Sequence, residues 1–174
     1  MRSTKKLTLS ATVTALGAAL LALGGVFEVL DLSVSALASL FVVFVYIEIG
    51  SPYTWLVWLA TSLSAFVIFP ASPLWIEYLL IFGFYPILKA YIERLLHPLW
   101  IPLKLLYVNA VITFLFFTFE LIFKTPLFST GRVYIKAGLW VIIVAAFFLY
   151  DVFLNVLIKY YFERFRSRIK HLLK

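Results

Sequence analysis

The chain has 174 residues, of which 64% are hydrophobic and only 13% are charged. An average soluble domain is about 45–50% apolar and about 25% charged, so a soluble protein of this composition would expose large apolar patches. The composition therefore predicts a polytopic membrane protein. At about 20 apolar residues per span, the length holds roughly six spans, which excludes a built-in ATPase, nucleic-acid-binding or soluble catalytic domain.

Six apolar runs, separated by glycine, proline, serine and charged residues, follow one another along the chain. They predict membrane-spanning helices at about 7–30, 32–49, 53–69, 74–96, 103–123 and 137–160. Tryptophan and tyrosine lie near most of the predicted ends, as is typical of membrane interfaces. The expected fold class is an all-α integral membrane protein, a bundle of six helices forming a single transmembrane domain over residues 1–174.

The basic residues predict the orientation of the bundle. If the N-terminus is cytoplasmic, twelve of the fifteen lysines and arginines fall in cytoplasmic segments, and the outside keeps only Lys124, Arg132 and Lys136. Both termini are therefore expected in the cytoplasm, and the net charge of +7 is interpreted as basic loops at that face rather than as nucleic-acid binding. The expected location is the plasma membrane, crossed several times.

The first predicted helix carries a stripe of small residues. Ala11, Ala15 and Ala19 are spaced four apart and fall on one face. Small residues at this spacing let another helix backbone approach closely in lipid. Two interpretations stay open: a docking surface for a partner protein, or packing inside the bundle itself.

The predicted outer ends of the helices collect polar and aromatic residues. Mixed charges beside aromatic rings could line a pocket for a small heteroaromatic or zwitterionic ligand. Ordinary solvated loop ends are the alternative, and Glu120 with Lys124 could form an exposed pair one helical turn apart. The candidate substrate-binding residues are Glu77, Tyr78, Glu120, Lys124, Arg132 and Tyr134, with Glu28, Asp31 and Lys136 nearby.

Asp151 lies about 14 residues, or about 21 Å, into the sixth predicted helix. An unpaired carboxylate facing lipid at that depth is costly, so Asp151 is expected to face the bundle or a partner. Lys89, at similar depth on the fourth helix, is the predicted partner. We interpret Lys89 and Asp151 as a structural ion pair in preference to a proton relay.

The segment 161–174 is amphipathic and basic. Apolar residues recur in it at spacings of three and four, and arginines and lysines lie off that stripe. The pattern predicts a C-terminal extension along the inner membrane surface, attracted to anionic lipid, with a docking site for a cytoplasmic subunit as the alternative.

Signatures of catalysis and of metal binding are missing from the sequence. It has no cysteine, only His97 and His171 as histidines, no P-loop, no G-x-S-x-G, no H-E-x-x-H and no paired intramembrane aspartates. We therefore expect no metal, no cofactor and no enzymatic activity. Membrane-bound catalysis on lipid substrates is a disfavoured alternative, because no catalytic constellation supports it.

The basic start K-K-L-T-L-S-A, six short helices and the Ala11/Ala15/Ala19 stripe resemble the substrate-binding S-components of energy-coupling-factor (ECF) transporters. The stretches 30–40 and 83–95 also look like those of small Firmicutes-type membrane proteins of S-component character. The resemblance implies that the chain binds a vitamin, a vitamin precursor or a trace metal from outside, in a pocket closed by outer loops. It implies that a separate transmembrane T-component docks on the alanine face and that two ATPases drive toppling of the S-component. The N-terminal histidine arrangement of nickel- and cobalt-type S-components is missing, which disfavours metal as the substrate.

A non-transport role is the alternative from another class. The same alanine stripe would suit a small accessory scaffold that packs against a membrane partner. A retained small molecule together with ATPase subunits would favour the S-component, and a stable complex without a bound small molecule would favour the scaffold.

Overall fold

The computed structural model describes residues 3–27, 30–121 and 133–165. In these ranges every regular element is helical, and six segments are long and apolar enough to cross a membrane. The predicted all-α class and the number of candidate spans are therefore confirmed. The membrane side that each terminus meets stays a prediction.

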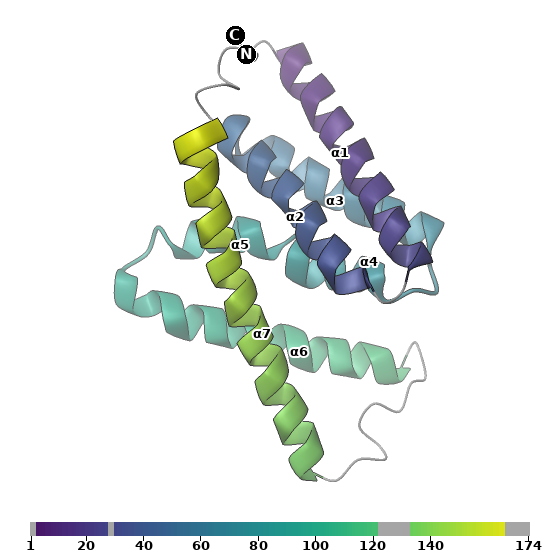
Figure 1. Cartoon of the computed structure of the whole chain (residues 1–174), viewed down its shortest axis with the longest axis vertical. Coiled ribbons are helices and arrows are strands. Elements are labelled where there is room, and N and C mark those ends of the chain that lie inside the picture. The colour runs from purple at the N-terminus through teal and green to yellow at the C-terminus, as the bar shows by residue number, and fades with distance from the viewer. Residues whose placement is uncertain (1–2, 28–29, 122–132, 166–174) are drawn as a thin grey trace. The chain divides into compact units, whose positions relative to one another are not determined.

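The helices follow one another in chain order (Figure 1). They are α1 (Ser3–Val26), α2 (Asp31–Glu48), α3 (Ser51–Ile68), α4 (Leu74–Glu77), η2 (Tyr78–Phe82), α5 (Tyr85–Ile92), η3 (His97–Leu99), α6 (Trp100–Leu121), α7 (Val133–Tyr160) and η4 (Tyr161–Phe165). Two of the short elements, η2 and η4, are π-helical, and η3 is a 3₁₀ turn.

Several boundaries differ from those expected at 7–30, 103–123 and 137–160. The first and sixth spans begin earlier, at Ser3 and Val133, because an apolar run marks the membrane-embedded part of a helix and not its polar ends. The first also ends earlier, at Val26, after two consecutive glycines, which favour the helix least after proline.

The fifth span starts at Trp100 instead of residue 103, although Pro102 follows. A proline is tolerated there because backbone N–H groups in the first turn have no acceptor within the helix. The fourth span ends at Ile92 instead of residue 96, and a turn over 93–96 follows it. Of the predicted amphipathic extension 161–174, the described part is η4, which continues directly from α7, and residues 166–174 lie outside the described ranges.

The chain forms two compact units, and the single transmembrane domain expected over 1–174 stays a prediction. The first, here called the N-terminal unit, comprises residues 1–87 and 152–174, and the second, the central unit, comprises residues 88–151. The boundary falls within α5 and within α7, so both helices contribute to both units.

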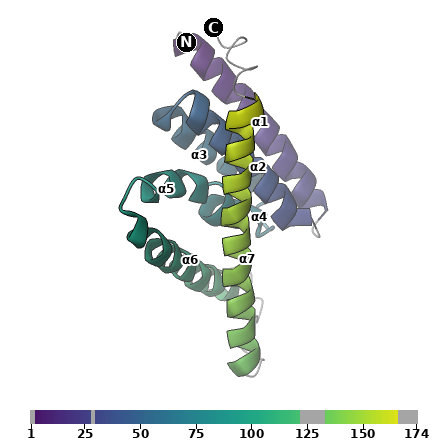
Figure 2. The same ribbon diagram turned by 60° about the vertical axis from the view of Figure 1, so that its left-hand side comes forward.

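In the N-terminal unit α1 packs against both α2 and α3, which also pack on each other (Figures 1 and 2). Gly50 joins α2 to α3 with φ +102°, a conformation that favours glycine because it has no Cβ. A cluster of Val13, Val45, Ile49 and Val57 forms part of the core beside this turn.

Two hydrogen bonds place several helix ends together in the N-terminal unit. The hydroxyls of Ser3 and Tyr53 lie 3.4 Å apart, which brings the start of α1 beside the start of α3. The Tyr161 hydroxyl donates to Glu48 Oε1 at 2.9 Å, which brings the end of α7 beside the end of α2. The start of α1, the α2–α3 turn and the end of α7 therefore lie at one end of this unit.

The fourth span is not one continuous α-helix. After α4 the chain forms the π-helical turn η2, in which the Gly83 amide donates to the Tyr78 carbonyl at 2.7 Å. Pro86 follows in the first turn of α5, and its missing N–H prevents a regular helix from running through this point. The Trp58 indole of α3 donates to the Leu79 carbonyl at 3.0 Å and so binds a carbonyl of the irregular turn.

In the central unit, α6 and the first part of α7 are joined by polar and aromatic contacts. The Trp140 indole of α7 donates to Asn109 Oδ1 of α6 at 2.8 Å. The Trp140 ring also stacks on Phe116, with centroids 5.6 Å apart. Since a partly buried indole N–H needs an acceptor, the bond to Asn109 favours this register of the two helices.

Candidate functional site

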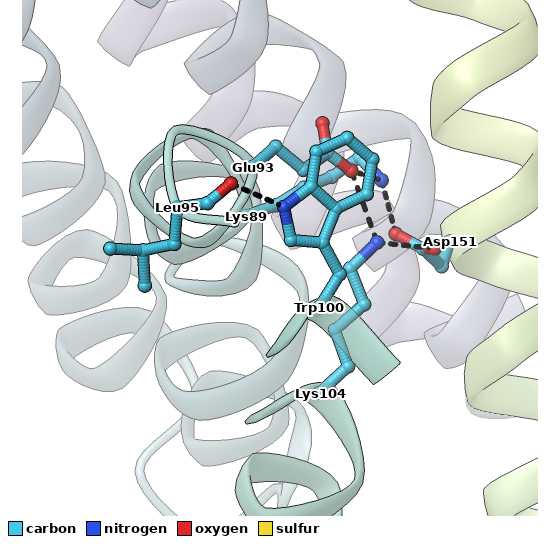
Figure 3. Close-up of polar contacts among 6 residues, drawn as sticks. All are labelled: Lys89, Glu93, Leu95, Trp100, Lys104 and Asp151. Carbon is cyan, nitrogen blue, oxygen red and sulfur yellow. Dashed lines mark hydrogen bonds and ion pairs between the residues drawn. The ribbon is translucent and has the colours of Figure 1, made fainter. Parts of the chain in front are cut away.

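Four charged side chains of the central unit form a cluster at the turn that joins α5 to η3. Lys89 lies on α5, Glu93 begins the following turn, Lys104 lies on α6 and Asp151 lies on α7. Figure 3 shows their charged groups pointing toward one another. We call these four residues the charge cluster.

Each lysine of the cluster contacts both carboxylates. Lys104 Nζ donates to Asp151 Oδ2 at 2.8 Å and to Glu93 Oε1 at 3.0 Å. Lys89 Nζ lies 2.6 Å from Glu93 Oε1 and donates to Asp151 Oδ1. The two oxygens of Asp151 thus accept from different lysines, while one oxygen of Glu93 is shared between them (Figure 3).

These contacts are important for stability because three of the four side chains are buried. The side chains of Lys89, Lys104 and Asp151 are 2%, 6% and 9% exposed, whereas Glu93 is 29% exposed. Removing an ion from water costs several kcal/mol, and the cost is offset only when opposite charges and hydrogen bonds surround it. In the charge cluster two lysines and two carboxylates surround one another, so each charge has an opposite partner and the net charge is zero.

The turn beside the cluster is held by a second indole contact. The Trp100 indole, at the start of α6, donates to the Leu95 carbonyl at 3.0 Å (Figure 3). The ring of His97 lies 4.5 Å from the Trp100 ring, centroid to centroid. These contacts fix the reversal that brings Lys104 of α6 back toward Glu93.

The chemistry of the charge cluster favours a structural role. Every charged group in it already has an oppositely charged partner at hydrogen-bond distance, so the cluster ties α5, α6 and α7 together. Among the described residues, no group of three or more His, Cys, Asp or Glu side chains could hold a metal ion.

The sequence pointed to Lys89 and Asp151, and the structure places them in direct contact. The sequence patterns do not assign Glu93 and Lys104 to the same site. The spacing of Lys89 and Glu93, one helical turn apart, was a usable signal. The position of Lys104 depends on the turn between two helices, which periodicity does not describe.

The proposed substrate-binding residues fall in both units. In the N-terminal unit, Glu77 ends α4 with a partly buried side chain, and Tyr78 begins η2 and is fully buried. In the central unit, Glu120 lies in α6. Tyr134 lies in α7. The side chains of these two fall outside the described part of the structure, as do Lys124 and Arg132. The grouping of these six residues into one pocket stays a prediction.

The first helix has two distinct faces of small residues. The face buried in the N-terminal unit carries small and apolar residues spaced three and four apart: Ser10, Val13, Gly17, Leu21 and Gly24. Ala11, Ala15 and Ala19 fall on the other face and are exposed. The N-terminal unit therefore uses a different stripe of α1 for its internal contacts from the alanine stripe seen in the sequence.

The glycines of the buried face allow close packing. A Cβ added at Gly17 would lie 3.1 Å from Thr61 Cγ2, and one added at Gly24 would lie 2.9 Å from Leu74 Cδ1. Close approach of neighbouring elements to α1 thus depends on glycines in this unit, and the exposed alanines are not needed for it.

The chain was compared with protein-family models, curated proteins and solved structures, and none of them matched. The resemblance to S-components thus depends on the residues of this chain alone.

Proposed function

We propose that the chain is the substrate-binding membrane subunit of an importer of the ECF type, without catalytic activity of its own. In this role it captures a vitamin-like small molecule from outside and docks on a transmembrane T-component powered by two separate ATPase subunits. The observation that carries the proposal is the exposed alanine face of α1, which comprises Ala11, Ala15 and Ala19.

The alanine face suits docking for a physical reason. Apolar surface alone does not drive association in lipid, so helices associate there through close packing and polar contacts. Alanines let a second backbone approach along three turns of α1, and the exposed Leu16 and Leu23 beside them add side-chain contacts. Because α1 is already held by α2 and α3 through its opposite face, a partner could bind the alanine face without disturbing the fold.

The interruption of the fourth span supports a binding region near Glu77 and Tyr78. Discontinuous membrane helices and π-helical turns are common at the binding sites of transport proteins, because they free backbone groups and reorient side chains. The interruption starts directly after Glu77, whose carboxyl is partly buried. A polar ligand at this position would gain a hydrogen bond to a partly buried carboxyl group. Glu120, Lys124, Arg132 and Tyr134 stay separate candidates for ligand contact, proposed from the sequence alone.

We propose that the protein lies in the plasma membrane with both termini in the cytoplasm. The two hydrogen bonds that bring the start of α1 and the end of α7 to one end of the N-terminal unit support an even number of crossings. The excess of lysine and arginine in the segments assigned to that side supports its cytoplasmic location.

An accessory scaffold remains the second candidate, because the exposed alanine face supports it equally. The two candidates differ in whether a small molecule is bound. The experiment is to express the full chain with an affinity tag in its native cells, purify it in mild detergent and identify retained proteins and small molecules by mass spectrometry. A T-component, two ATPases and a heteroaromatic or zwitterionic compound would support the importer. A stable membrane partner with no small molecule would support the scaffold, and recovery of the chain alone would contradict both.

A further inference from the structure

A groove of about 330 Å³ lies between α2 and the end of α7, within the N-terminal unit. One wall is the α2 stripe Leu40, Val43, Phe44 and Ile47, and the facing wall is a stripe with the same spacing on α7 and η4, Leu154, Leu157, Ile158 and Tyr161. Positions i, i+3, i+4 and i+7 fall on one face of a helix, so two apolar faces meet here without filling the space between them.

We propose that this groove binds one acyl chain of an anionic phospholipid. The α2 wall extends over eight residues, a rise of about 10 Å along the helix axis, and its side chains are hydrocarbon throughout. Leu154 is fully buried and lies on the α7 side of the groove. The volume is at the lower end of the range of about 300–1,000 Å³ seen for small-molecule sites, and its lining suits an alkyl chain better than a polar ligand.

One end of the groove is polar, and the lipid headgroup would lie at this end. The Tyr161 ring packs edge-on against Phe44, with centroids 6.0 Å apart, and its hydroxyl donates to Glu48. This pair of contacts links α2 to η4 beyond the apolar part. An alkyl chain in the groove would therefore have its polar end near Tyr161, at the end of the unit where the helices terminate.

The Arg164 guanidinium beside this polar end favours an anionic headgroup, since Glu48 accepts from the Tyr161 hydroxyl and Glu163 is paired with Lys159. Tyr160 also lines the groove, and the Arg164 guanidinium lies 6.0 Å from the centroid of its ring. Lys159 is exposed over 78% of its side chain, although Glu163 lies 4.0 Å from it. In the part of the segment 159–174 that the structure describes, Lys159 and Arg164 are the basic residues, and both are exposed. Basic sites between membrane helices at a cytoplasmic face are typical binding sites for anionic lipid headgroups.

The test uses the full chain in nanodiscs of phosphatidylglycerol and phosphatidylcholine, followed by extraction into detergent and native mass spectrometry. The inference expects one phosphatidylglycerol molecule to stay bound per chain. Val43→Trp and Leu157→Trp fill the groove from its two walls, and both are expected to remove that lipid. The matched control is Leu56→Trp, at a residue of α3 that is 57% exposed, and this variant should keep it.

A second variant tests the headgroup without touching the groove. Lys159→Gln with Arg164→Gln changes exposed side chains only, so folding should be unaffected. At about 1 kcal/mol for each of the two basic residues removed, the preference for phosphatidylglycerol over phosphatidylcholine should fall by about 30-fold. The preference should persist unchanged in Leu56→Trp.

Several results would overturn the inference. Equal lipid retention by Val43→Trp and Leu56→Trp would show that the groove holds no acyl chain. Equal retention of phosphatidylcholine and phosphatidylglycerol by the unmodified chain would contradict the anionic headgroup. A dimer that dissociates in Val43→Trp would show that a second copy of the chain occupies the groove instead. None of these results depends on the importer proposal.

Discussion

The ammonium nitrogen of Lys104 lies 2.8 Å from Asp151 Oδ2, and both side chains are almost fully buried. The two residues are 47 positions apart and belong to α6 and α7, so the contact is a tertiary one. Glu93 and Lys89 complete the cluster from the α5 side. A buried ion pair contributes little net stability compared with an apolar pair, yet removal of one partner leaves the other charge uncompensated.

We expect Asp151→Asn to destabilise the protein by about 3–5 kcal/mol, because Lys89 and Lys104 would then share Glu93 as their remaining charged partner in the charge cluster. Thermal unfolding in detergent measures the change. Lys159→Gln, at an exposed pair, is the control and should change stability by about 0–1 kcal/mol. A melting temperature of Asp151→Asn equal to that of the control would show that the cluster is not structural.

Charge balance should rescue part of this loss. Asp151→Leu alone leaves two buried lysines beside one carboxylate, whereas Asp151→Leu with Lys104→Met leaves Lys89 paired with Glu93. The double variant should therefore be more stable than Asp151→Leu alone, with a coupling energy of about 1–3 kcal/mol. A full double-mutant cycle measures it, and additive losses would contradict direct coupling.

The two faces of α1 should respond differently to added volume. Gly17→Leu would force its side chain against Thr61, and overpacking of this kind typically costs about 1–3 kcal/mol. Ala15→Leu adds a similar bulk on the exposed face and should stay within about 0.5 kcal/mol of the unmodified chain. Melting temperatures of the isolated variants decide this, and equal losses would mean that both faces are packed internally.

Single cysteines can test the orientation directly, because the natural chain has none. Ala71→Cys lies in the α3–α4 turn, which we expect outside the cell, and Leu96→Cys lies in the α5–η3 turn, which we expect inside. A membrane-impermeant thiol reagent should label the first in intact cells and the second only after permeabilisation. Labelling of both in intact cells, or the reverse order, would contradict the topology.

The helical class and the six spans could be predicted from the sequence because hydropathy is a property of local runs. The Lys89–Asp151 contact could be anticipated for a related reason, since charges at matched membrane depth have few other partners. The interruption at Tyr78–Phe82 could not be predicted. The apolar run is continuous there, so hydropathy gives no sign of the change in hydrogen bonding that precedes Pro86.

The buried face of α1 is the clearest example of a feature that could not be predicted from the sequence. Both the alanine stripe and the stripe of Ser10, Gly17 and Gly24 have helical spacing, so spacing alone cannot choose which one faces the bundle. The choice depends on which side chains α2, α3 and α4 place against α1. Thr61 and Leu74 lie against the glycines, and this is information from distant segments of the chain.

The central claim is that the alanine face of α1 docks on a transporter subunit, and Ala15→Trp tests it most directly. The control is Ala110→Trp, at an exposed alanine of α6. Each variant is measured twice, by the melting temperature of the isolated chain and by recovery of the T-component with its ATPases from native membranes. The account predicts unchanged melting temperatures for both variants and loss of the complex in Ala15→Trp alone. Equal recovery of the complex by both variants, or a lower melting temperature for isolated Ala15→Trp, would contradict it.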